Sequence, residues 1–170
     1  MFTTRPEITG TFGVITSTHW LATAVGMSIL ERGGNAFDAC VASAFVLHVV
    51  EPNLVGPAGE VPGIFYSAKS KKIEVLCGQG TTPGAATLDR YRAEGLTLIP
   101  GNGLLAAVVP GAFDAWMILL RDHGTKSLRD VLEPAIYYAQ TGHPLLPRVS
   151  DTIASMKDFF EAYWPTSAEV

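Results

Sequence analysis

The chain has 170 residues, of which 48% are hydrophobic and 16% are charged, and its formal net charge at pH 7 is -4. Charged residues make up roughly 25% of typical soluble domains, so the low share here indicates that large parts of the surface are covered. The acidic balance, without any run of like charges, argues against nucleic acid and anionic membranes as partners, because both bind clustered Lys and Arg.

The length and the apolar segments are typical of one compact domain. A chain of this size can bury roughly 70% of its extended surface. The start, MFTTRPEITGTFGVIT, has no basic stretch before an apolar one and predicts no secretory signal. The longest apolar segments fall short of the roughly 20 residues that cross a bilayer. We therefore expect a cytoplasmic protein without a membrane partner.

A strand and two helices are the first predicted elements. The stretch GVITST, residues 13–18, alternates and is β-branched, which is typical of a strand. Thr18 or Ser17 would then cap a helix from about Trp20 to Arg32, which two glycines end. The next helix, from about Ala36 to Val50, is apolar on nearly every side, so it is expected to be central and buried.

The hinge between these helices reads RGGNAFDA, residues 32–39. Gly33 or Gly34 would take a left-handed conformation at the end of the first helix. Asn35 would cap the next helix, with Asp38 at its third position facing the free N–H groups at the positive end of the helix. We predict that these residues hold the buried helix in place and bind no substrate.

A hairpin and several helices follow. GIFYSA and IEVLCG flank KSKK, which predicts two strands joined by a short charged turn. The remaining expected elements are a short polar helix over TLDRYRAEG ending at Gly95, a strand and glycine loop over LTLIPGNGLLAAVVPG, an amphipathic helix over 111–123 with Phe113, Trp116, Met117 and Leu120 on its apolar face, a helix from Ser127 to Gly142 with Pro134 kinking it or offsetting its first turn, and one last helix from Pro147. Strands and helices are grouped rather than alternating, which favours an α+β layered fold.

A loop rich in Gly and Pro, VVEPNLVGPAGEVPG, is the first candidate for chemistry. Its backbone N–H groups could face an anion or a substrate carbonyl, although a structural turn is the simpler interpretation. The loop matches neither a phosphate loop nor the dinucleotide fingerprint, and no cofactor is predicted. Cys40 and Cys77 form no CxxC pair and are expected to be reduced, buried thiols.

No catalytic triad or metal site is apparent. Thr18 and His19 could be a hydroxyl nucleophile beside a base, but neighbouring residues on a strand point to opposite faces, so we reject the pair. His48, His123 and His143 lack metal-ligand spacing. We expect His48 to be a core histidine whose hydrogen bonds are satisfied.

The run GVITSTHWLATAVGMSILERGGNAFDACVASAFVLHVVEPN resembles the gamma-glutamyltransferase family, also called gamma-glutamyl transpeptidases or glutathione hydrolases. In that family a helix ending in Lys or Arg-Gly-Gly-Asn-Ala-x-Asp-Ala is followed by an alanine-rich buried helix, Val-Glu-Pro, a glycine loop and a strand pair. The segments PGAFDAW, HGT and LEPAIYYAQTGHP continue the likeness. The resemblance covers nearly the whole chain but only part of the family protein.

This resemblance implies an N-terminal-nucleophile hydrolase fold, a four-layer sandwich with helices on two stacked sheets. Residues 1–170 would be the N-terminal segment of the large subunit, without the small subunit. Family precursors cleave themselves, and the threonine exposed at the start of the small subunit attacks the gamma-glutamyl carbonyl with its own amine as base. The resemblance therefore implies no catalytic residue in this chain, which alone would be inactive. The implied partners are the remainder of the large subunit, the small subunit and a small gamma-glutamyl or related substrate.

Two departures from the family pattern bear on the substrate. An Arg in the segment matching LCGQGTTP holds the substrate's α-carboxylate in glutathione-active members, and here that position is Gln79, the one substrate-binding residue implied. The loop also has Pro57, Ala58 and Glu60 where the family prefers glycine. These departures indicate a divergent branch acting on another gamma-glutamyl compound, amide or acyl group. The alternatives are a non-catalytic binding or scaffold member of the same fold, and a self-sufficient α+β domain.

Overall fold

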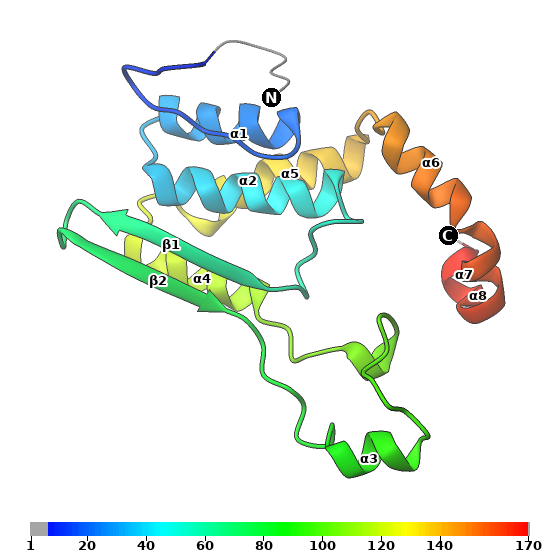
Figure 1. Ribbon diagram of the computed structural model, residues 1–170. Coiled ribbons are helices and arrows are strands. Elements are labelled where there is room, and N and C mark those ends of the chain that lie inside the picture. Colours follow the sequence, from blue (N-terminus) through cyan, green and yellow to red (C-terminus); the bar gives the residue numbers. More distant parts are fainter. Residues whose placement is uncertain (1–6, 170) are drawn as a thin grey trace.

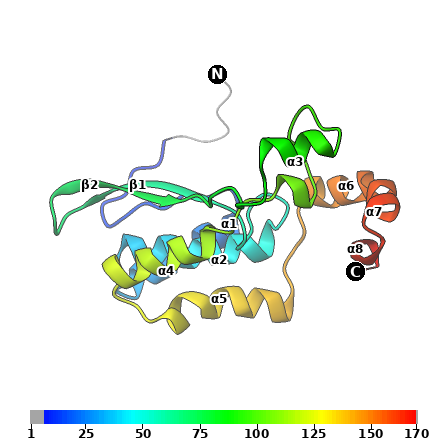
Figure 2. The same cartoon turned by 90° about the horizontal axis from the view of Figure 1, so that it is seen from below.

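The central element of the computed structural model, which describes residues 7–169, is helix α2 (Ala36–Val50). It packs against α1 (Trp20–Glu31), α4 (Ala112–His123) and α5 (Leu128–Thr141). An antiparallel hairpin of β1 (Val61–Ser67) and β2 (Lys72–Gly78) forms a layer beside α4 and α2, with α5 on the opposite side (Figures 1 and 2). This layering confirms the predicted α+β class.

Helix α2 is buried as predicted, because small and branched apolar residues occur on nearly all its sides. At the contact with α1, a Cβ added to Gly26 would lie 2.4 Å from the hydroxyl of Ser43, so the two backbones approach closely. Ser43 in turn donates a hydrogen bond of 2.9 Å to the carbonyl of Ala22. The main core contains Leu21, Ala22, Ile29, Ala39, Val41, Ala42, Phe45, Val46, Val50, Leu119, Leu120, Val131 and Ala135.

The hinge between α1 and α2 has the predicted local structure. Gly33 adopts φ +80°, which ends α1. The Asn35 side chain accepts hydrogen bonds from the N–H groups of Phe37 and Asp38, at 2.8 and 3.0 Å. Asp38 accepts one from the Asn35 N–H at 2.8 Å, which completes a reciprocal capping box. The local interpretation of the hinge is confirmed.

The same hinge also holds a distant turn. The buried carboxylate of Asp38 accepts hydrogen bonds from the N–H and hydroxyl of Thr125, at 2.8 and 2.7 Å, and from the N–H of Lys126 at 3.0 Å. The Asn35 amide donates to the carbonyl of His123 at 2.7 Å. Burial alone would raise the pKa of Asp38, but the hydrogen bonds from Lys126, Asn35 and Thr125 outweigh it and lower that pKa. The hinge therefore fixes the turn between α4 and α5.

The hairpin is confirmed and is apolar on both faces. Phe65 and Leu76 pack against the core. On the opposite face two cross-strand pairs, Ile64 with Val75 and Tyr66 with Ile73, are between 60% and 76% exposed. A sheet with one face in water alternates apolar and polar residues, so this pattern is typical of a sheet covered on both sides.

Three predictions of regular structure were wrong. Residues 13–18 form no strand, and the segment 96–111 contains only the short 3-10 helix η1 (Leu104–Ala106), because the described residues offer neither segment a partner strand. The predicted last helix is three short ones, α6 (Pro147–Ser155), α7 (Lys157–Tyr163) and α8 (Pro165–Ala168). Pro165 has no N–H to continue the helix before it.

Other expectations hold in part. The polar helix α3 (Leu88–Ala93) and the helix after Ser127 are present, and α5 runs through Pro134 as one element. On α4, Leu120 is buried, Trp116 and Met117 are partly buried and Phe113 is half exposed.

The two cysteines were expected to be buried, and this was wrong, since both are exposed in the described chain. Cys77 lies on the outer face of the hairpin, opposite Pro62. Cys40 lines a groove between α2 and the hairpin. Both cysteines therefore lie at surfaces that the helical core leaves uncovered.

Candidate functional site

Three segments meet at the end of β2, and we call residues 56–60, 78–81 and 109–113 the glycine junction (Figure 1). The loop after α2 reaches the start of α4, where the N–H groups of Gly111 and Ala112 donate to the carbonyl of Gly59, at 3.2 and 3.0 Å. The N–H of Phe113 donates to the carbonyl of Pro57 at 3.2 Å. The loop thus supplies carbonyl groups that satisfy the first turn of α4.

Glycines allow these segments to touch. A Cβ on Gly80 would lie 1.4 Å from the carbonyl oxygen of Val109, and one on Gly111 would lie 2.4 Å from that of Gly78. A Cβ on Gly78 would lie 2.4 Å from the Cβ of Ala115. No side chain fits at these positions, so the backbone on either side of residue 79 is held against α4 and the segment just before it.

Gln79 lies between two of these glycines and its side chain is exposed. Its amide nitrogen donates a hydrogen bond of 3.1 Å to the carboxylate of Glu60, which comes from the loop and is also exposed. The structure therefore brings together two of the positions at which this sequence departs from the family pattern. Sequence reasoning named both residues but did not predict that they are in contact.

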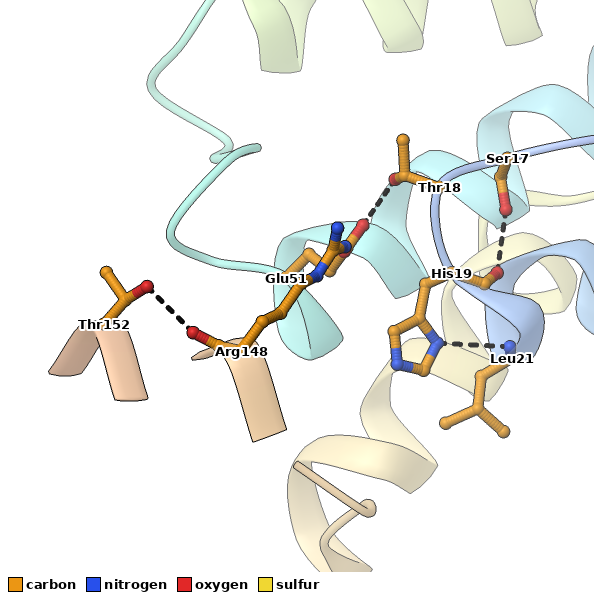
Figure 3. Close-up of polar contacts among 7 residues, drawn as sticks. All are labelled: Ser17, Thr18, His19, Leu21, Glu51, Arg148 and Thr152. Atoms are coloured by element: carbon orange, nitrogen blue, oxygen red, sulfur yellow. Dashed lines mark hydrogen bonds and ion pairs between the residues drawn. The ribbon is translucent and has the colours of Figure 1, made fainter. Parts of the chain in front are cut away.

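A second polar cluster joins the N-terminal segment, the end of α2 and the start of α6 (Figure 3). The carboxylate of Glu51 is fully buried at the C-terminal cap of α2, where the negative end of the helix dipole disfavours it. The hydroxyl of Thr18 and the guanidinium of Arg148 both donate to it. Sequence reasoning missed Glu51, although the Val-Glu-Pro motif at the helix end pointed to this position.

His19, rather than Thr18 or Ser17, caps α1, which corrects the prediction. Its Nδ1 accepts a hydrogen bond of 3.2 Å from the N–H of Leu21, while the hydroxyl of Ser17 donates to the carbonyl of His19 (Figure 3). The Nε2 atom is buried, and no residue in the range 7–169 pairs with it. Burial, the largest effect, lowers the pKa of His19 even though the nearby Glu51 raises it.

Thr18 and His19 do not form a nucleophile and base. The hydroxyl of Thr18 donates to Glu51, and the His19 ring caps a helix. Residues 7–169 contain no group of three or more His, Cys, Asp or Glu that could hold a metal ion. In this same range no helix combines the length and apolarity that a membrane span requires.

His48 differs from the expectation of a satisfied core histidine. Both its ring nitrogens are buried, and neither has a hydrogen-bond partner within the described chain. The ring packs edge-on against Phe45, with ring centroids 5.4 Å apart. Burial lowers the pKa of His48. Its neighbours on α2 are apolar, which explains why no partner is near.

Comparison with known proteins finds relatives that are named as hydrolase or acylase proenzymes. The glutathione hydrolase-like YwrD proenzyme of Bacillus subtilis is 40% identical over 140 residues, covering 82% of this chain and 26% of the relative. The acylase ACY 1 proenzyme of Pseudomonas sp. (strain V22) is 38% identical, covering 88% and 28%. The chain thus spans about a quarter of the length of these curated relatives.

Solved structures agree. The structure of LmbA2991HD superposes with a TM-score of 0.93 and 57% identity, covering 100% of this chain and 29% of that one. The gamma-glutamyltranspeptidase of Helicobacter pylori gives 0.85 and 31%, covering 94% and 46%. These likenesses confirm that the chain carries part of an N-terminal-nucleophile hydrolase fold. The family model described as Gamma-glutamyltranspeptidase matches residues 22–170, and the chain belongs to that family.

Proposed function

We propose that residues 1–170 are the N-terminal segment of the large subunit of an enzyme that transfers or hydrolyses a gamma-glutamyl group or a related acyl or amide group. The nucleophilic threonine lies outside this chain, at the start of a small subunit that self-cleavage releases. Family membership supports the class of reaction, and several relatives are named proenzymes. The cytoplasmic location expected from the sequence stays a prediction.

The observation that carries this proposal is the outer face of the hairpin. Ile64, Tyr66, Ile73 and Val75 are exposed there in two cross-strand pairs, although the opposite face already packs on the core. Burying a fully exposed large apolar side chain contributes about 1.5–3 kcal/mol, so covering these four partly exposed ones is worth roughly 4–8 kcal/mol. A second sheet from the remainder of the protein would gain that energy, as in a sandwich of two stacked sheets.

The polar groups of this segment support a role in binding rather than bond breaking. Thr18 and His19 are engaged in structural hydrogen bonds, so neither supplies a nucleophile or base. Gln79 is exposed at the rigid glycine junction. We propose that Gln79 contacts the substrate acyl group, at the position where the family resemblance implies an Arg.

The full-length protein tests the proposal. Mass spectrometry of the purified protein should show two polypeptides, the second beginning with threonine, and the protein should release nitroaniline from gamma-glutamyl-p-nitroanilide or a related acyl anilide. Replacing that threonine by alanine should abolish both cleavage and release. Residues 1–170 alone should release none. An uncleaved protein that is inactive on every anilide, or release by the segment alone, would refute the proposal.

A second candidate is a non-catalytic binding or scaffold member of the family, and the neutral Gln79 favours it, because an amide lacks the charge of an Arg. Calorimetric titration of the full-length protein with glutamate and related acyl compounds, beside Gln79→Arg, separates the two. Binding without turnover, altered by Gln79→Arg, would support the binding protein. Binding that is unaffected by the substitution would make Gln79 structural.

A further inference from the structure

The glycine junction carries a single charge. Among residues 56–60, 78–81 and 109–113, Glu60 is the only charged residue, and none is Lys or Arg. Within residues 7–169, Glu60 forms no ion pair. In the described part of the chain, the charge at the junction is therefore a carboxylate without an ion-pair partner.

The backbone that carries this carboxylate is fixed. The carbonyl of Gly59, next to Glu60, accepts hydrogen bonds from two N–H groups at the start of α4. On the facing segment, Gly78 and Gly80 hold residue 79 so closely against its neighbours that no side chain fits at either glycine. The position of the Glu60 main chain beside residue 79 is therefore fixed, and its carboxylate contacts the Gln79 side chain.

The contact between Glu60 and Gln79 also occupies part of the Gln79 amide, the group that would contact the substrate. The amide nitrogen of Gln79 donates to Glu60 at 3.1 Å. The amide has a second N–H, but a ligand carboxylate that accepted from it would lie beside the negatively charged Glu60. A neutral amide, a hydroxyl or a cation could instead donate to Glu60 or to the Gln79 carbonyl oxygen, and would meet no repulsion.

We infer that Glu60 is a specificity-determining residue that favours acyl substrates whose group at Gln79 is neutral or cationic, and disfavours those with a carboxylate there. This inference rests on the proposed function, in which Gln79 contacts the substrate. For two carboxylates about 5 Å apart in a largely hydrated site, Coulomb repulsion corresponds to roughly 3- to 10-fold in kcat/KM.

Two substrates that differ only at this group provide the test. The full-length protein is assayed with gamma-glutamyl-p-nitroanilide and with its α-carboxamide. The wild type should have the higher kcat/KM for the carboxamide. Glu60→Gln should raise kcat/KM for the carboxylate substrate by about 3- to 10-fold and change that for the carboxamide less than about twofold. Glu31→Gln, an exposed residue on α1 outside the junction with the same charge change, should alter neither.

Ionic strength supplies a readout that needs no substitution. Raising the salt concentration from about 0.02 to about 0.5 M should screen the repulsion, so the wild-type preference for the carboxamide should shrink. Glu60→Gln serves as the control, and its preference should stay constant. Turnover of both substrates with a preference that neither Glu60→Gln nor salt changes would overturn the role of Glu60 and leave the proposed function intact. An absence of turnover in the wild type, with no self-cleavage, would overturn both.

Discussion

The buried carboxylate of Asp38 provides the sharpest test of how the fold is held together. It accepts four hydrogen bonds, from the N–H of Asn35, the N–H and hydroxyl of Thr125 and the N–H of Lys126. Hydrogen bonds to a charged group contribute about 1.5–3 kcal/mol each, but bonds that share one acceptor are not additive. We expect Asp38→Ala to lower the free energy of unfolding by about 3–5 kcal/mol, with a smaller loss for Asp38→Asn, which keeps one acceptor oxygen.

Hydrogen exchange monitored by mass spectrometry measures the contact between Asp38 and residues 125 and 126 directly in the intact protein. The amides of Thr125 and Lys126 should exchange roughly 10- to 100-fold faster in Asp38→Ala, because their acceptor is gone. Asp130→Ala is the matched control, since Asp130 occupies the same capping-box position on α5 but is exposed and bonds only to Ser127. Unchanged exchange at residues 125 and 126 in Asp38→Ala would refute the role of these hydrogen bonds in holding the turn.

The effect of Asp38 also depends on pH. Its pKa in the folded protein is lowered, so the unfolded chain takes up a proton at a higher pH than the folded one. Its stabilisation is therefore complete above the ordinary value of 3.8 and is lost as the pH falls through the lowered pKa. The difference in stability between wild type and Asp38→Ala should shrink below that value. A difference that grows on acidification would contradict the assignment.

Three further predictions concern other contacts. Arg148→Ala leaves the buried carboxylate of Glu51 without its cation. Because the Arg148 side chain is 61% exposed, we expect a loss of about 1–3 kcal/mol in urea unfolding. No loss would show that Glu51 is stabilised without Arg148. Gly80→Ala forces a Cβ to 1.4 Å from a backbone carbonyl oxygen and should lower the melting temperature. Gly84 has open space around it, so Gly84→Ala should leave the melting temperature the same or higher. Equal effects of the two substitutions would contradict the tight junction. Burial lowers the pKa of His48 below 6.5, so the unfolded chain binds the extra proton and stability should fall as the pH drops below 6.5. Thermal unfolding measured against pH should show a weaker fall in His48→Phe. An identical pH profile would argue that the ring nitrogens of His48 are hydrated.

Local sequence patterns determined the elements that depend on neighbouring residues. The apolar run of α2, the capping residues Asn35 and Ser127 and the short charged turn of the hairpin each specify a structure within a few residues. These were predicted correctly for that reason. The strand expected at 13–18 was wrong, because a strand needs a pairing partner, which a local pattern does not supply.

Tertiary structure decided which distant residues meet. The bonds from residues 125 and 126 to Asp38 and from Arg148 to Glu51 join positions that no local spacing relates. Sequence reasoning identified Gln79 and Glu60 as separate departures from a family pattern. Their contact continues the hairpin by one residue beyond the pair of Val61 with Gly78, so it follows from the register of β1 and β2. The sequence by itself therefore determined the helices through α5, the hairpin and the family. The polar contacts between distant segments follow from tertiary structure, since only the folded backbone brings their atoms within hydrogen-bond distance.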